Sequence, residues 1–183
     1  IGGKIIRSEN AAKTHHQISQ VVVKYLQDIG RVDRVLDYGC GKLRYFDVLM
    51  GIGRDVFFLD SERQISREQK IRGEYTTVKN FLGSYDRASV MLPTEVEDKK
   101  QSFDLIVCIN VLSAIPCKFK MSELLENIRM MLGRNGKAIF VNQHYCSSFS
   151  KFKKGDEHHH GYIYKGLRGF SYYGLMDKKL VTG

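Results

Sequence analysis

The chain has 183 residues, enough for one domain over residues 1–183, and its 43% hydrophobic and 27% charged residues are ordinary for a globular protein. The formal net charge of +9 favours nucleic acid, acidic substrates or anionic surfaces as partners, but the basic residues are spread along the chain and name no partner by themselves. No apolar run reaches the ~18 residues that cross a membrane, and no basic region followed by an apolar core marks a secretory signal, so we expect no membrane partner.

The first half of the chain alternates between helical and strand patterns. Apolar residues recur at spacings of three and four in the helical segments and form short continuous runs in the strands. The expected segments are helices at 10–29 and 44–50 and strands at 32–37 and 56–59. Ser61-x-x-Gln64 is a capping box that opens a further helix. The apolar spacing predicts that this helix continues to Tyr85, with an inward face of Ile71, Tyr75, Val78, Leu82 and Tyr85.

The second half continues the same alternation. The expected segments are strands at 88–92, 103–109 and 137–142, a helix at 121–132 and a turn at 134–136. Such alternation calls for right-handed crossovers and predicts the α/β class, as a three-layer αβα sandwich with a mostly parallel central sheet. Residues 10–142 form this core. The pattern loosens in residues 143–183, where one more helix is expected at 171–180.

The most informative stretch is Val-Leu-Asp-Tyr-Gly-Cys-Gly at residues 35–41. An apolar strand ends at Asp37, two residues before a Gly-x-Gly turn that lets backbone approach a ligand closely. Asp60 ends the next apolar run, 19 residues after Gly41, which is close to the ~20 expected between a nucleotide-binding turn and the acid that holds a ribose. The two strand ends therefore offer a nucleoside a tight turn and a carboxylate.

Residues 35–41 resemble the first motif of the class I (Rossmann-like) S-adenosylmethionine-dependent methyltransferases. Residues 57–61 look like the ribose-binding strand end of that family, and residues 103–116 look like its fourth strand and the following loop. The resemblance covers roughly residues 10–142 and implies S-adenosyl-L-methionine as the cofactor.

The resemblance also implies roles for individual residues. Asp37 would lie near the amino group of the cofactor, the glycine turn against its methionyl and ribose part, and Asp60 on both ribose hydroxyls. Pro93 and Thr94 would border the adenine, and Asn110 would line the methionyl end. The predicted cofactor-binding residues are Asp37, Tyr38, Gly39, Cys40, Gly41, Asp60, Ser61, Pro93, Thr94, Asn110 and Val111. His144, which follows the fifth strand, is the candidate catalytic residue on the acceptor side.

The chain departs from the family pattern in three ways. The usual third glycine of the first motif is missing, because Lys42 and Leu43 follow Gly41. The family's common Glu-His pair is Ser113-Ala114 here. The usual closing antiparallel hairpin is not recognised before Gly183; either the edge of the sheet is built differently or the chain is cut short, and exposed apolar surface there would favour a homodimer.

Several readings stay open. A dinucleotide oxidoreductase is disfavoured, because the third glycine of its fingerprint would be position 44, which is Arg44. The methyl acceptor is expected to be a small molecule; the alternatives are nucleic acid, suggested by the charge and by aromatic residues among lysines near the C-terminus, or a domain that binds the cofactor without catalysis. RNA is preferred to DNA, because the Asp/Asn-Pro-Pro-Tyr/Phe signature of exocyclic-amine DNA methylation is absent after Asn110.

The cysteines and histidines indicate the setting and argue against a metal site. No C-x-x-C spacing links the cysteines, which fits a reduced, cytoplasmic protein; they are Cys40, Cys108, Cys117 and Cys146. Three consecutive histidines at 158–160 rarely converge on one ion, so we expect no metal and interpret them as part of a lid or acceptor-side loop.

Overall fold

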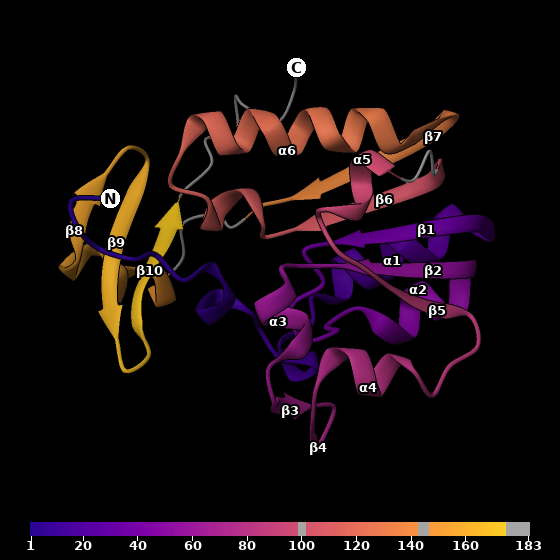
Figure 1. Cartoon of the computed structure of the whole chain (residues 1–183), viewed down its shortest axis with the longest axis horizontal. Coiled ribbons are helices and arrows are strands. Elements are labelled where there is room, and N and C mark those ends of the chain that lie inside the picture. Colours follow the sequence, from indigo (N-terminus) through magenta and orange to yellow (C-terminus); the bar gives the residue numbers. More distant parts are fainter. Residues whose placement is uncertain (99–101, 143–146, 175–183) are drawn as a thin grey trace. The chain divides into compact units, whose positions relative to one another are not determined.

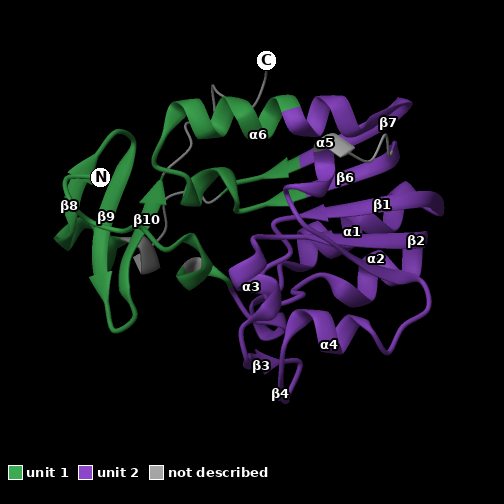
Figure 2. Ribbon diagram, in the orientation of Figure 1, with its two compact units in different colours: residues 1–12, 108–126, 140–183 green, residues 13–107, 127–139 purple. Residues whose placement is uncertain are grey.

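The structure is a computed structural model that describes residues 1–98, 102–142 and 147–174. The chain divides into two compact units (Figure 2). Unit 1 comprises residues 1–12, 108–126 and 140–183, and unit 2 comprises residues 13–107 and 127–139. No helix in the described part of the chain is both long and apolar enough to span a membrane.

A five-stranded sheet contains all five strands that the sequence predicts (Figure 1). Its order is β5-β2-β1-β6-β7, and its strands are β5 (Ala88–Met91), β2 (Gly53–Leu59), β1 (Val32–Tyr38), β6 (Phe103–Ile109) and β7 (Leu132–Val141). The pairs β1–β2, β1–β6 and β2–β5 are parallel. Helices flank the sheet, which confirms the predicted α/β class with a Rossmann-like arrangement; they are α1 (Gln20–Ile29), α2 (Phe46–Ile52), α3 (Glu62–Ser66), α4 (Val78–Leu82), α5 (Glu95–Asp98) and α6 (Lys118–Met131).

The central strands form the apolar core. Val35 and Leu36 of β1 and Val56 and Phe58 of β2 have no exposed surface, as expected for parallel strands covered on both faces. The parallel register sets Asp37 beside Phe58 and Tyr38 beside Leu59. Because these strands are fixed by burial, their carboxyl ends lie side by side at one edge of the sheet.

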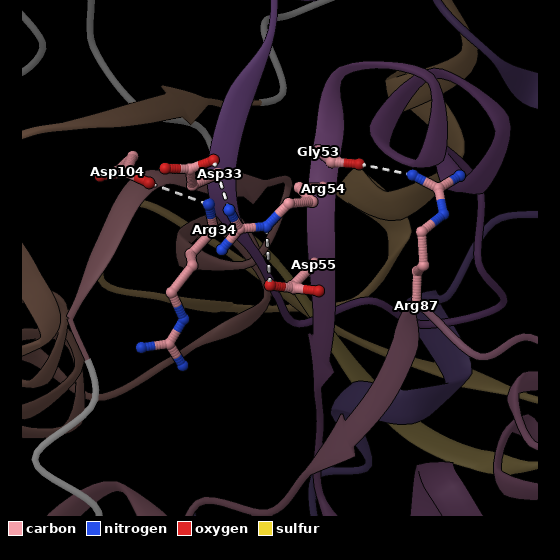
Figure 3. A network of polar contacts seen from close by, with 7 residues as sticks. All are labelled: Asp33, Arg34, Gly53, Arg54, Asp55, Arg87 and Asp104. Carbon is pink, nitrogen blue, oxygen red and sulfur yellow. Dashed lines mark hydrogen bonds and ion pairs between the residues drawn. The ribbon is translucent and has the colours of Figure 1, made fainter.

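The amino ends of the strands carry a network of paired charges. Figure 3 shows its members, Asp33, Arg34, Gly53, Arg54, Asp55, Arg87 and Asp104. Arg54 contacts Asp33 and Asp55 at 3.2 and 3.4 Å, and Arg87 donates to the carbonyls of Gly53 and Met50 at the end of α2. The charges of the aspartates and arginines offset one another here, so the network gives this end of the sheet a polar surface.

The predicted helix at 10–29 is wrong in its first half. Its amino-terminal part forms two short 3₁₀ turns, η1 (Ser8–Ala11) and η2 (His15–Gln17), and the α-helix begins only at Gln20. Thr14 and Gln17 form a capping box around η2, and this local pairing competes with continuous helix.

The single helix expected from Ser61 to Tyr85 is also wrong. It is replaced by α3, a hairpin of β3 (Gln69–Ile71) and β4 (Glu74–Thr76), and α4. Arg72 and Gly73 form the hairpin loop with φ of 48° and 102°, which a helix cannot accommodate. Tyr75, predicted to face inward, is consequently 75% exposed.

The C-terminal part forms a separate sheet of antiparallel strands in the order β10-β9-β8. These are β8 (Asp156–His158), β9 (Gly161–Gly166) and β10 (Gly169–Gly174), preceded by η4 (Ser147–Lys154). The helix expected at 171–180 is wrong where it can be compared, because residues 171–174 belong to β10; its remainder lies outside the described residues. The turn expected at 134–136 is likewise part of β7.

Candidate functional site

The glycine turn folds over the end of β2. The backbone N–H groups of Gly39 and Cys40 both donate to the carbonyl of Leu59, at 2.7 and 3.0 Å. Gly39 and Gly41 have φ of 80° and 56°, in the left-handed region that glycine enters without steric cost. The predicted tight glycine turn is therefore present at the end of β1, and the close approach of a ligand to it stays a prediction.

Asp60 anchors this turn through its carboxylate. Its Oδ2 accepts from the backbone N–H of Gly41 at 2.9 Å, and its Oδ1 accepts from that of Ser61 at 2.8 Å. Burial raises the pKa of Asp60, while these two hydrogen bonds oppose the rise. Each carboxylate oxygen keeps a second lone pair, so Asp60 can hold the turn and still accept from a ligand.

Asp37 is a second carboxyl group at the same edge. It is 4% exposed, and burial, followed by the charge of Asp60, raises its pKa to about 7. Because burial and a nearby carboxylate oppose its ionisation, the charged form of Asp37 is stabilised by a cation. The ammonium and sulfonium groups of S-adenosylmethionine match this demand, and its ribose diol matches the free acceptor capacity of Asp60.

Gln64 braces the turn in a way that the sequence did not reveal. Its backbone N–H donates to Ser61 Oγ, which is one half of the predicted capping box, but its side-chain amide donates to the carbonyl of Gly41 and to Gln69 Oε1. Gln69 in turn donates to the backbone carbonyl of Gln64 at 3.0 Å. Gly41 is thus held by Asp60 on its N–H and by Gln64 on its carbonyl.

Leu43 occupies the position of the missing third glycine. Its φ is 57°, and its side chain is completely buried. The backbone therefore takes a conformation that favours glycine, while the side chain packs in the core. Cys40 beside it is also buried, and burial raises the pKa of its thiol.

Pro93 and Thr94 lie just beyond the end of β5, which pairs with β2. Both residues are exposed at the surface. The turn that carries them is fixed by Glu95, whose side chain accepts from the backbone N–H of Leu92 at 2.8 Å. Their placement at a strand end matches the prediction, and their role beside adenine stays a prediction.

Asn110 and Val111 follow β6 and belong to unit 1. Asn110 has φ of 61°, and its N–H donates to the carbonyl of Val141 at 2.6 Å. Buried Ser113 donates from Oγ to the carbonyl of Asn110 at 3.2 Å. Ser113, which stands where the family commonly has Glu, thus links two residues of this loop by a hydrogen bond.

The predicted acceptor-side histidines are only partly described. His144, the candidate catalytic residue, lies outside the described residues. His158 contacts the carbonyl of Pro116 at 3.2 Å, whereas His159 and His160 are exposed. No group of three or more His, Cys, Asp or Glu residues in the described segments could hold a metal ion.

Comparison with known proteins finds a similarity to methyltransferase domains. A family model described as a methyltransferase domain matches residues 11–167. A curated relative, the uncharacterized protein YmfD of Escherichia coli strain K12, is 42% identical over 180 residues, which cover 98% of this chain and 81% of the relative.

Solved structures share the fold at low sequence identity. PH0226 from Pyrococcus horikoshii OT3 is 16% identical with a TM-score of 0.61, covering 87% of this chain and 73% of that one. An S-adenosylmethionine-dependent methyltransferase from Clostridium acetobutylicum ATCC 824 is 16% identical with a TM-score of 0.54, covering 92% and 65%. The N-methyltransferase NodS from Bradyrhizobium japonicum WM9, in complex with S-adenosyl-L-homocysteine, is 20% identical with a TM-score of 0.52; the match covers 66% of this chain and spans only 60% of NodS.

Proposed function

Because this chain belongs to the methyltransferase-domain family, we propose that it binds S-adenosylmethionine at the ends of β1 and β2 and transfers the methyl group to a small-molecule acceptor. The observation that carries the proposal is a pair of carboxyl groups at neighbouring strand ends: Asp37 is buried, and Asp60 is half-buried and accepts a hydrogen bond from the backbone N–H of Gly41 in the glycine turn. When bound, the cofactor supplies a methyl group already activated by a sulfonium.

The chain's own residues would bind and orient this cofactor. Asp60 would accept from the ribose hydroxyls while its bonds to Gly41 and Ser61 keep it aimed. Asp37 would ionise against the cationic amino-acid end, and the backbone of Gly39 and Gly41 would lie along the ligand without side chains in the way. Orientation of this kind supplies much of the acceleration when the donor is already reactive.

The aromatic residues of η4, β9 and β10 in unit 1 support a small-molecule acceptor over nucleic acid. Phe152 stacks on Tyr173 with ring centroids 3.6 Å apart and meets Tyr164 edge-on at 5.5 Å. Tyr172 is buried. A platform for single-stranded nucleic acid needs open ring faces on which bases can stack, and these rings are engaged with one another.

Calorimetry tests the cofactor site. S-adenosylmethionine and S-adenosylhomocysteine should bind the wild-type protein, and NAD should not. Asp60→Asn should weaken binding of the first two at least about tenfold, because it removes charge-assisted hydrogen bonds. Asp86→Asn, which changes an exposed acid in the loop before β5, is the matched control and should leave the affinity unchanged. Equal affinity of Asp60→Asn and wild type would refute the ribose assignment.

A labelled-methyl screen tests the acceptor and separates catalysis from binding alone. Purified protein and methyl-labelled cofactor are incubated with small-molecule extracts, total RNA or DNA. Label in the small-molecule fraction that is lost in Asp60→Asn supports the proposal. Label confined to RNA would move the acceptor to nucleic acid, and cofactor binding with no label in any fraction would favour a non-catalytic domain.

A further inference from the structure

A small basic cavity lies next to the glycine turn, within unit 2. Its volume is about 110 Å³, and it is bounded by η2, by the residue that follows Gly41 and by the β3–β4 hairpin. The side chains that line it are Thr14, His15, His16, Lys42, Lys70 and Arg72. Three permanent cations and two imidazoles therefore face a space of about the size of a small oxyanion, and no residue of this described lining is acidic.

Arg72 reaches the cavity from a strained backbone position. Its φ of 48° lies in the left-handed region, in a two-residue hairpin loop where Asn, Asp or Gly is normally preferred. Its side chain is only 21% exposed, donates to Asp47 at 2.6 Å and lies over the ring of Phe46. A guanidinium has five N–H donors, so these contacts leave several for a ligand.

Two positively charged neighbours act on His15, one of the two imidazoles at the cavity. Burial lowers the pKa of His15, and the positive charges of His16 and Arg72 lower it further, while Asp47 opposes them. A carboxylate would bring a single negative charge to this surplus of cations. A phosphoryl group brings about two, with three acceptor oxygens.

We propose that this cavity binds the phosphoryl group of a small molecule, or free inorganic phosphate. The ligand chemistry is that of a terminal phosphate dianion held by Lys42, Lys70 and Arg72, with the histidines and Thr14 as further hydrogen-bonding partners. This site is separate from the Asp37–Asp60 pair, and it does not depend on methyl transfer.

Thermal unfolding at constant ionic strength and pH tests the proposal. Inorganic phosphate should raise the midpoint more than chloride or acetate does. Arg72→Asn should weaken the apparent phosphate affinity about tenfold, because it removes charge-assisted hydrogen bonds, and Lys70→Gln should weaken it about threefold through the loss of an exposed charge. Lys79→Gln, on the exposed surface of α4, is the matched control and should respond like wild type.

The choice of ligands separates the sources of the anion. Phenyl phosphate that binds more tightly than inorganic phosphate indicates a phosphorylated small molecule, and equal affinity indicates a free oxyanion. Either result supports the site if Arg72→Asn and Lys70→Gln abolish or weaken the binding. Equal stabilisation by acetate and phosphate would overturn the proposal, as would phosphate affinity unchanged in both variants. Binding of a single-stranded oligonucleotide without any response to phosphate would overturn it in favour of nucleic acid. Calorimetry with S-adenosylmethionine runs in parallel, so failure here is distinguishable from failure of the methyltransferase assignment.

Discussion

Asp37→Asn should stabilise the free protein at alkaline pH, although it removes a predicted ligand-binding group. The pKa of Asp37 rises from its ordinary value of 3.8 to about 7 in the folded protein because of burial and the charge of Asp60. Between these two values the folded chain holds a proton that the unfolded chain has lost, so the stability of the wild type falls as the pH rises through this window. One pKa unit corresponds to about 1.4 kcal/mol, which gives a penalty of up to ~4 kcal/mol above pH 7. Asparagine has the same shape and no charge, so the variant avoids this penalty.

The assay is urea unfolding of Asp37→Asn and wild type at several pH values from 4 to 8. The variant should match the wild type near pH 4 and exceed it by up to ~4 kcal/mol near pH 8, with Asp86→Asn as an exposed control that shows no such trend. Calorimetry of the same proteins should show that wild-type affinity for S-adenosylmethionine rises with pH as Asp37 ionises, and that the variant binds weakly throughout. A stability difference that is constant from pH 4 to 8 would refute the reasoning.

Two further substitutions test the parts that hold the turn, and a third tests the packing at the amino end of β2. Leu43→Gly should destabilise the protein by about 2 kcal/mol, since lost burial outweighs relief of the left-handed backbone; increased stability in urea unfolding would contradict the packing argument. Gln64→Leu leaves the carbonyl of Gly41 without its side-chain donor and should lower the affinity for S-adenosylmethionine about tenfold by calorimetry, whereas wild-type affinity would show that the brace is unnecessary. Gly53→Ala brings a methyl group within 2.7 Å of Val56 and 2.9 Å of Val35 and should cost about 1–3 kcal/mol; an unchanged thermal midpoint would argue against tight packing there.

The strands were predictable because burial on both faces produces continuous apolar runs. Breaks inside a helical pattern were not predictable in this way. Ile71, Val78 and Leu82 are all buried, as their spacing predicted, yet the first belongs to β3 and the other two to α4. Gly73 was the available signal for the break. Arg72, the other residue of the loop, gave no such signal, because arginine does not favour the positive φ that Arg72 adopts here.

The candidate site was predictable to the extent that it follows from parallel strands. Asp37 and Asp60 end neighbouring strands, and such ends meet at one edge of a sheet. The brace from Gln64 to Gly41 was not predictable, because it depends on α3 ending at Ser66 so that Gln69 can fold back to meet it. A local pattern identified Gln64 as part of a cap, but its longer-range contact is a product of the fold.

The departure from the family's glycine pattern bears directly on whether the turn can hold a cofactor. A leucine in the left-handed region costs about 1–2 kcal/mol relative to its preferred backbone, and Leu43 takes that conformation with φ of 57°. Removing a buried leucine side chain costs about 2–5 kcal/mol, and Leu43 is fully buried. Packing therefore outweighs the strain, and the backbone keeps the path that a glycine would give it. Leucine therefore occupies this position with its strain offset by packing, so the missing glycine is no argument against a cofactor at this strand end.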